Sequence, residues 1–275
     1  MQRSWFSLGK SCHSSHRSLL YLTTPQRSRT MSTKKPTIWL NNNLKQYLKP
    51  KNLILGIPND ISPFTYWRWL NATSIEQLTE KEIKLGEYAR EEEQKISKIY
   101  FSNKSIPNAL IPKIIYPLFN NQKPIKKTPS LFAIYAAFIV ASQEFIDVLY
   151  NFCLGENQIE KLLFYNPKKD KLEDSSFYFI NICESYKYCQ IVINSSITRE
   201  YLRTKDESII YHTPENQEEL NNFLFSKEAL FCPVDIWHDL SIYRSIFMSN
   251  RLRLALFNSK LKRDISLLSC NLTSN

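Results

Sequence analysis

Hydrophobic residues recur at helical spacing in one long and well-delimited stretch, residues 75–99. Ser74 precedes it as the expected N-cap, and Gln77 stands at the capping-box position. Glutamate and lysine residues four positions apart support an exposed face on the same helix. These pairs are Glu80–Lys84 and Glu91–Lys95. The pattern predicts an amphipathic helix with one buried face.

Other stretches of the chain also show helical patterns. We expect a short helix over 37–49 that ends at Pro50, and a buried central helix over 130–154, where the first residues are apolar on all sides. A further helix is expected over 156–165. Another begins at Thr213-Pro214, where a capping residue precedes proline, and runs to about Phe225. The last stretch, 234–263, reads as one long helix or two short ones.

The stretch 234–263 carries a second pattern, with apolar residues at alternating spacings of four and three. The positions are Ile236, Leu240, Tyr243, Phe247, Asn250, Leu254, Phe257 and Leu261. Such a seam fits a partner helix, with Asn250 as the single polar residue that fixes the register. It fits equally an internal helix with a basic solvent face. Basic residues flank the seam: Arg244, Arg251, Arg253, Lys260, Lys262 and Arg263.

Only the C-terminal half shows a clear β pattern. Residues 177–183 and 186–194 are rich in aromatic and β-branched side chains around Glu184-Ser185, which predicts a hairpin, and 208–212 is a candidate third strand. We therefore predict an α+β fold that is predominantly helical, with a small antiparallel β-hairpin or sheet in the C-terminal half.

Five prolines between residues 104 and 129 prevent a continuous helix there. We interpret 104–129 as an extended Pro/Lys-rich connector between an N-terminal helical region, 31–103, and a C-terminal helical domain with a β-hairpin, 130–275. Lys123, Lys126 and Lys127 lie in this connector, within a tract from Glu93 to Glu144 that has seven lysines and no acid. An exposed basic loop of this kind contacts a phosphate backbone or an anionic membrane, or is simply a solvated linker.

The excess positive charge of the chain is confined to its first 59 residues, which contain ten Lys/Arg and no acid before Asp60. From Asp60 onward, 26 basic residues balance 26 acidic residues. Within residues 1–30, Arg3, Lys10 and Arg17 recur every seven positions on one side of a helical projection. Together with frequent serine this composition is typical of a mitochondrial targeting peptide.

Met31 opens a plausible second start of translation, whose product lacks the targeting segment. We therefore expect a location in the mitochondrial matrix, with peripheral contact to the inner membrane as a variant. The alternative is a cytosolic or nuclear location for a product that begins at Met31. No stretch is long and apolar enough to predict a transmembrane span.

Composition limits the chemistry. Four glycines in 275 residues exclude a Gly-rich phosphate loop, and the six cysteines include no Cys-x-x-Cys pair. Cys183 and Cys189 could face each other across the predicted hairpin, but buried thiols are the simpler interpretation; with His212 they would be the first residues to consider for a metal. His238, between Asp235 and Asp239, is expected to be a surface or capping histidine. We predict no enzyme activity, no cofactor and no metal.

The low glycine content, the abundance of Asn, Lys, Ile and Tyr, and the imported precursor are together similar in general character to fungal mitochondrial accessory factors; no motif carries this resemblance. We expect a non-enzymatic factor of organellar gene expression that associates with mRNA or the mitoribosome. The alternatives are a respiratory-complex assembly factor at the inner membrane, or a subunit of a cytosolic or nuclear assembly. The expected partner or RNA contacts are Lys123, Lys126, Lys127, Arg244, Arg251, Arg253, Lys260, Lys262 and Arg263, with a protein partner on the C-terminal helix.

Overall fold

The computed structural model describes residues 37–41, 53–56, 66, 70, 72, 74–117, 130–134, 138–192, 200–203, 209–263 and 265–273. The chain divides into two units, residues 1–35 and 36–275, and every described residue belongs to the second. The predicted targeting segment and Lys123, Lys126 and Lys127 lie outside the described residues.

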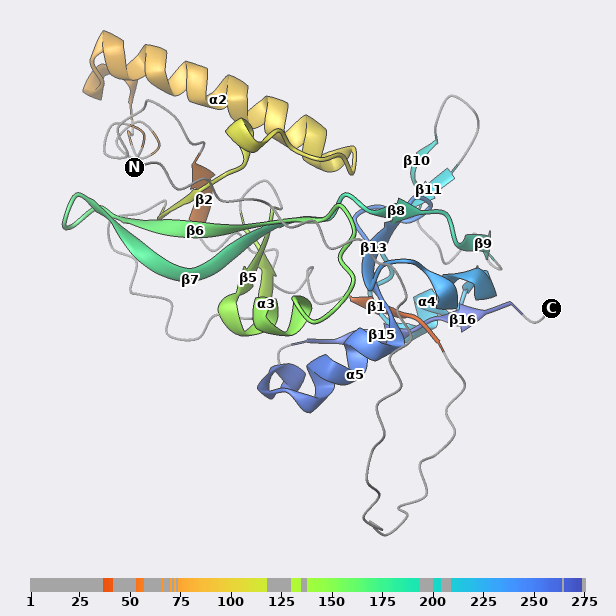
Figure 1. Cartoon of the computed structure of the whole chain (residues 1–275). Coiled ribbons are helices and arrows are strands. Elements are labelled where there is room, and N and C mark those ends of the chain that lie inside the picture. The colour runs from red at the N-terminus through yellow and green to blue at the C-terminus, as the bar shows by residue number, and fades with distance from the viewer. Residues whose placement is uncertain are drawn as a thin grey trace, which may run out of the picture. The chain divides into compact units, whose positions relative to one another are not determined.

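The described part of the chain is mainly β-structure, with sixteen strands in four sheets and four α-helices. The prediction of a predominantly helical protein is therefore wrong. Most of the missed strands are only three or four residues long, so they carry too little sequence for an alternating pattern to emerge. The order of elements along the chain is shown in Figure 1.

The largest sheet has six strands in the order β2-β3-β6-β7-β5-β4. Its strands are β2 (Leu53–Gly56), β3 (Ile114–Pro117), β4 (Leu131–Ala133), β5 (Ile139–Ser142), β6 (Gln158–Asn166) and β7 (Lys171–Asn181). The long β6–β7 hairpin lies at its centre, and β3 pairs with β6 in the parallel direction. Part of the predicted connector is thus a sheet strand, with Ile115 fully buried.

The second sheet has five strands in the order β15-β1-β14-β13-β8. Its strands are β1 (Trp39–Asn41), β8 (Ser185–Tyr186), β13 (Ile236–Asp239), β14 (Ile246–Met248) and β15 (Leu267–Ser269). The strand β1 pairs antiparallel with both β14 and β15, although more than 200 residues separate them in the sequence. The helix predicted over 37–49 is therefore wrong for its described residues.

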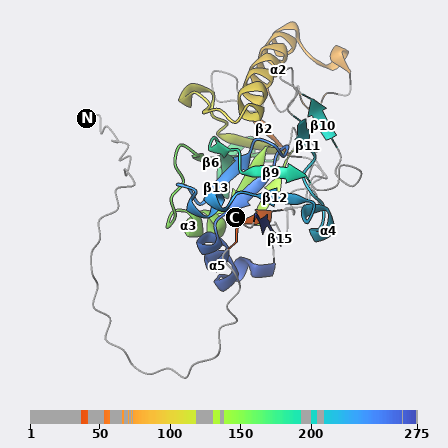
Figure 2. The same ribbon diagram turned by 90° about the vertical axis from the view of Figure 1, so that its right-hand side faces the viewer.

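Two smaller sheets complete the β-structure. One contains β9 (Cys189–Val192), β12 (Phe223–Phe225) and β16 (Asn271–Leu272), and the other pairs β10 (Glu200–Arg203) with β11 (Ile209–Tyr211). Figure 2 faces these strands. The strand expected over 208–212 is confirmed by β11, but the hairpin expected around Glu184-Ser185 is not formed. Instead β7 pairs with β5 and β6, β8 with β13, and β9 with β12.

The four α-helices of the described residues are α2 (Glu80–Phe101), α3 (Gln143–Leu149), α4 (Gln217–Leu220) and α5 (Asn250–Asn258). Short 3₁₀ turns lie at Ile75–Gln77, Asn108–Leu110, Lys227–Phe231 and Lys260–Arg263. The prediction of α2 is confirmed, but its N-cap is Thr79 and not Ser74. Thr79 Oγ1 accepts from Glu82 N–H, and the Glu82 carboxylate accepts from Thr79 N–H, which forms a complete capping box.

The remaining helical predictions are wrong over most of their length. Residues 130–154 contain β4, β5 and the short α3, and residues 156–165 lie largely in β6. In 234–263 two strands precede α5, so the predicted seam does not lie on one helix. Ile236 and Ile246 pack into one hydrophobic cluster, whereas Trp237 and Phe247 pack into another. Strands buried on both faces read as continuous apolar runs, and such runs are easily mistaken for buried helix.

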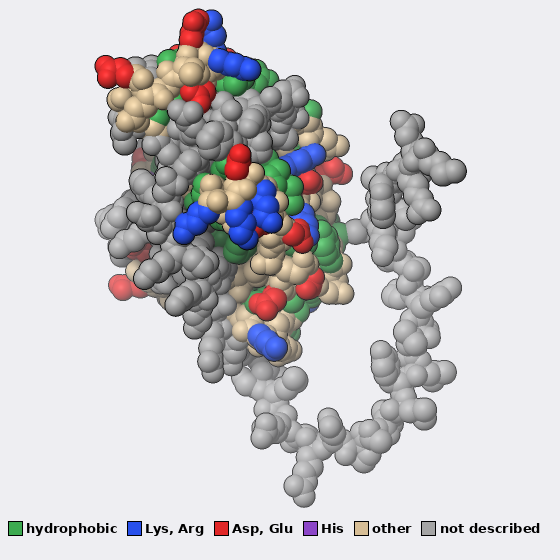
Figure 3. Space-filling view, turned by 90° about the vertical axis from the view of Figure 1, so that its left-hand side faces the viewer, with side chains coloured by type: hydrophobic (Ala, Val, Ile, Leu, Met, Phe, Trp, Pro, Cys, Tyr) green, Lys and Arg blue, Asp and Glu red, His purple; other side chains and the backbone are tan. Residues whose placement is uncertain are grey.

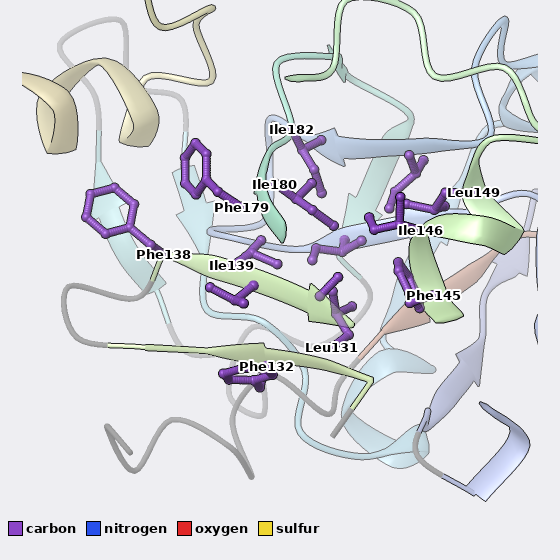
Figure 4. Packing of buried hydrophobic residues seen from close by; sticks show 14 of the residues in the cluster. Leu131, Phe132, Phe138, Ile139, Phe145, Ile146, Leu149, Phe179, Ile180 and Ile182 are labelled. Atoms are coloured by element: carbon purple, nitrogen blue, oxygen red, sulfur yellow. The ribbon is translucent and has the colours of Figure 1, made fainter. Parts of the chain in front are cut away.

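The main core joins the two larger sheets. It contains side chains from β5 and β7, from α3, and from β13, β14 and α5. Figure 4 shows Phe145, Ile146 and Leu149 of α3 beside the strands that carry Ile139 and Ile180. The second cluster, around Trp237, lies on the other face of the five-stranded sheet. This sheet is therefore covered on both faces, which fixes the β13–β14 turn that builds the site described below.

Candidate functional site

A cavity of about 380 Å³ lies where the C-terminal end of α2 meets β11 and the β13–β14 turn. Tyr100, Phe101, Ser102 and Asn103 line it from the end of α2, and Ile210, His212 and Thr213 line it from β11 and the residues after it. Asn41, Ala133 and Ile139 contribute from the two larger sheets, and His238 to Leu240 and Ile242 to Arg244 contribute from the turn. Most of these walls are apolar or aromatic, as in small-molecule sites.

Asp239 fixes the shape of the β13–β14 turn. Its side chain is 2% exposed and accepts backbone hydrogen bonds from Ser241 N–H (2.9 Å), Tyr188 N–H (2.8 Å) and Cys189 N–H (2.9 Å). Burial raises the pKa of this carboxyl, and the backbone hydrogen bonds oppose that rise. Both carboxylate oxygens are thus engaged by main chain, so Asp239 builds the wall and has little capacity left for a ligand.

His238 is also buried, so the expectation of a surface or capping histidine is wrong. Its Nδ1 lies within hydrogen-bond distance of the Ser245 carbonyl oxygen, and its backbone N–H donates to Glu184 O at 2.9 Å. Burial lowers the pKa of the imidazole to about 4, and the nearby Arg244 guanidinium contributes to this lowering. The ring is therefore neutral at physiological pH. Because a carbonyl can only accept, Nδ1 carries the proton and Nε2 keeps a lone pair.

Arg244, in the same turn, also lines the cavity. It adopts a positive φ of 52°, which is unusual for a residue other than glycine, asparagine or aspartate. Its guanidinium carbon lies 3.9 Å from the centre of the Phe101 ring and 4.9 Å from that of Tyr243. Within the described part of the chain, its buried Nε has no hydrogen-bond partner. A buried donor without a partner is costly and invites an explanation.

Stacked rings extend the Arg244 side of the cavity towards the surface. Tyr201 of β10 stacks on Tyr243 with ring centres 3.8 Å apart and planes within 11°, and His212 packs edge-on against Tyr201 at 5.1 Å. Tyr201 is 42% exposed. Tyr243 is anchored because its N–H donates to Tyr211 O at 2.8 Å. We call Phe101, Tyr201, Tyr243 and Arg244 the aromatic–arginine wall.

The structure distributes the predicted basic contact residues over different environments. Arg251 forms two hydrogen bonds with Asp235, from Nε to Oδ1 at 2.5 Å and from Nη2 to Oδ2 at 2.6 Å. Asp235 is 1% exposed and also accepts from Cys153 N–H and Ser249 Oγ. Arg251 is thus committed to a structural ion pair, although its side chain is 66% exposed.

Two other predicted basic residues of the C-terminal stretch, Arg253 and Lys260, do not line the cavity. Arg253 lies over the rings of Trp39, at 4.2 Å, and Phe257, at 4.5 Å, while Lys260 is exposed at the start of the last 3₁₀ turn. Lys262 and Arg263 belong to that same turn, and their side chains lie outside the described residues. Among the predicted contacts that the structure describes, only Arg244 lines the cavity.

A second charged surface lies at the tip of the β6–β7 hairpin. Figure 3 faces this end of the molecule and shows Lys and Arg side chains beside acidic ones. Lys169 and Lys171 both approach Glu173, at 3.0 and 3.6 Å, and Lys161 approaches Asp174 at 2.7 Å. Over residues 160–174 four lysines are balanced by four acids, so this hairpin has no net charge.

Sequence reasoning missed the cavity because its walls come from distant segments. The signal available was the close spacing of Asp235, His238 and Asp239, of which His238 was expected to be a surface or capping histidine. The burial of His238 depends on β13 lying inside a five-stranded sheet, which no local pattern reveals.

Metal and disulfide chemistry find little support in the described residues. No group of three or more His, Cys, Asp and Glu side chains is placed there to hold a metal ion. Cys153, Cys183, Cys189, Cys232 and Cys270 are free thiols, and burial raises the pKa of Cys189 to about 12. Within the described residues, no helix has the length and apolar character needed to cross a membrane.

Comparison with known protein families finds no matching family, and comparison with curated proteins finds no significant match. The site must therefore be interpreted from its own chemistry.

Proposed function

We propose that this chain is a non-enzymatic mitochondrial accessory factor that acts in organellar gene expression by contacting mRNA or the mitoribosome. The observation that carries the proposal is the aromatic–arginine wall, in which Tyr201 stacks on Tyr243 and Arg244 lies over Phe101. Unpaired RNA bases stack on aromatic rings and on guanidinium planes, and this mode of contact needs no extended basic surface. It therefore suits a chain whose charges balance from Asp60 onward.

The N-terminal segment supports the compartment. Residues 1–30 have five basic residues and no acid, and Arg3, Lys10 and Arg17 fall on one side of a helical projection. Changing these three residues to Glu should abolish mitochondrial recovery of the full chain in cell fractionation, while the amount of soluble folded protein stays the same. Unchanged mitochondrial recovery would remove the compartment from the proposal.

The RNA contact is tested by ultraviolet crosslinking of the full-length protein to RNA in isolated mitochondria. We expect Tyr201→Ala to reduce the crosslinked RNA several-fold, because it removes an exposed ring from the wall. Tyr150→Ala is the matched control: Tyr150 is 60% exposed but is not part of the wall, so its crosslinking should stay at the wild-type level.

Two results would contradict the RNA contact. The first is equal crosslinking of the Tyr201→Ala, Tyr150→Ala and wild-type proteins. The second is copurification with respiratory complexes and no bound RNA, which would favour the assembly-factor alternative.

A further inference from the structure

The cavity beside Arg244 has room for one flat ligand. Its volume of about 380 Å³ lies within the range of small-molecule sites, and Phe101, Ile139 and Tyr243 provide an apolar and aromatic lining. Polar side chains line it as well, both outside the turn (Asn41, Ser102, Asn103, His212 and Thr213) and within it (His238, Asp239 and Arg244). Of these, the turn supplies the charged groups and a buried imidazole.

Arg244 brings hydrogen-bond donors to this cavity, because a guanidinium carries five N–H groups and no acceptor. The guanidinium carbon lies 3.9 Å from the centre of the Phe101 ring, and the N–H groups of a guanidinium lie in its own plane. Its buried Nε has no partner within the described residues, and Asp239, the nearby acid of the turn, is saturated by backbone N–H groups. Because Nε is itself shielded from solvent, a ligand with adjacent acceptors would meet the terminal Nη groups of this guanidinium.

The backbone conformation of Arg244 also supports a binding role. A φ of 52° at an arginine is strained, and strain of this kind persists where the surrounding structure holds a residue for a purpose. Here Tyr243 N–H bonds to Tyr211 O, and Ser245 Oγ donates to Ile242 O at 2.9 Å, so both sides of Arg244 are fixed. The turn thus holds the backbone of Arg244 in this conformation.

His238 supplies the complementary acceptor. Its Nδ1 proton is engaged by the Ser245 carbonyl, which leaves the Nε2 lone pair on a neutral ring that lines the same cavity. The site therefore offers donors on Arg244 and an acceptor on His238.

We propose that this cavity binds the guanine base of an unpaired nucleotide, with Arg244 donating to guanine O6 and N7 and His238 accepting a base N–H. The proposal rests on the proposed function in one respect, that the nucleotide belongs to RNA. Arginine pairs with O6 and N7 of guanine through two hydrogen bonds, whereas adenine presents an amino group in place of O6. Adenine would therefore oppose one guanidinium N–H with a second donor.

Calorimetric titration of the full-length protein with GMP, AMP, CMP and UMP tests the proposal directly. We expect GMP to bind at least tenfold more tightly than AMP and more tightly than either pyrimidine nucleotide. Arg244→Gln should weaken GMP binding at least tenfold. Arg253→Gln is the matched control, because Arg253 is also stacked on aromatic rings with a buried Nε but lies outside the cavity; it should bind GMP like the wild type.

A second variant keeps the test valid if Arg244→Gln does not fold. Leu240 lines the cavity and is 49% exposed, so Leu240→Trp can fill the space without disturbing the core. We expect this variant to keep the wild-type melting temperature and to lose GMP binding at least tenfold.

Three results would overturn the proposal: no binding of GMP by the wild type, equal affinities for GMP and AMP, or undiminished GMP binding by Leu240→Trp. These results are separable from those of the proposed function. A protein that binds GMP in the cavity but crosslinks to no RNA keeps the site and loses the RNA role. A protein that crosslinks to RNA but ignores GMP keeps the role and loses this site.

Discussion

Two arginines of the same stretch, Arg251 and Arg244, lie in opposite situations. Arg251 gives two hydrogen bonds to the buried carboxylate of Asp235, which also accepts from Ser249 and Cys153. Arg244 lies over aromatic rings, has a strained backbone, and has a buried Nε without a partner in the described chain. One arginine completes a structural cluster, and the other lines a cavity. Charge alone does not distinguish them.

The largest expected effect on the free energy of unfolding concerns the ion pair between Asp235 and Arg251. Asp235→Ala should lower the free energy of unfolding by about 4 kcal/mol, because it removes a buried carboxylate and leaves its hydrogen-bond donors without an acceptor. Denaturant unfolding of the full chain measures this loss. Arg251→Gln should cost less, since the arginine is 66% exposed and Ser249 and Cys153 still bond the carboxylate. A loss below about 1 kcal/mol for Asp235→Ala would remove its structural role.

The next largest effect is the pH dependence of stability that is due to His238, which lines the cavity with Arg244. Its pKa of about 4 in the folded protein lies below the ordinary histidine value of 6.5, so the unfolded chain binds a proton more readily between these pH values. The stability due to the neutral ring is present above pH 6.5 and is lost as the pH falls towards 4. The loss amounts to about 3 kcal/mol.

Unfolding curves at several pH values measure the His238 contribution. In His238→Gln this part of the pH dependence should disappear. The contribution of Asp239, whose pKa is raised, has the opposite sign and remains in both proteins, so it cancels in the comparison. Identical pH profiles for the two proteins would show that His238 is solvated.

A smaller effect separates the two arginines directly. Arg244→Gln should change the free energy of unfolding by less than about 1 kcal/mol, because the lost stacking on Phe101 is offset by removal of a buried donor without a partner. The same denaturant unfolding applies. If Arg244→Gln destabilises the protein as much as Asp235→Ala, both arginines are structural and the distinction fails.

The smallest effect is expected at the β6–β7 hairpin. Lys161 and Asp174 form an ion pair whose side chains are 46% and 76% exposed. Solvent and salt screen such a pair, so Lys161→Gln should leave the melting temperature unchanged within experimental error. A clear decrease that disappears at high salt would show that the hairpin charges contribute more than their exposure indicates.

The sequence predicted those elements whose cause is local. The helix α2 was found because it is 22 residues long and carries its pattern within itself, although its cap lies five residues further on, at Thr79. The strand β11 was found because branched and aromatic residues are concentrated there. The strands β1, β13 and β14 were missed because each has only three or four residues, and their pairing depends on distant partners.

In the candidate site, too, only the features with a local cause could be predicted from the sequence. Arg244 was named as a contact because it is basic, which is a local property. The burial of His238, the saturation of Asp239 and the stacking of Tyr201 on Tyr243 depend on pairings among distant strands, so no pattern in the sequence could indicate them. The sequence therefore pointed to one residue of the cavity but not to the cavity.

The position of β1 has a consequence for how the protein is made. This strand comes early in the chain, yet its neighbours β14 and β15 come from the last third, and β15 lies at residues 267–269. Pairing across so many residues is slow, because the loop must close before any contact stabilises it. During synthesis from the N-terminus, β1 therefore stays without its sheet partners until nearly the whole chain has emerged. The polypeptide cannot complete its second sheet before that point, whereas all six strands of the largest sheet lie within residues 53–181 and are available earlier.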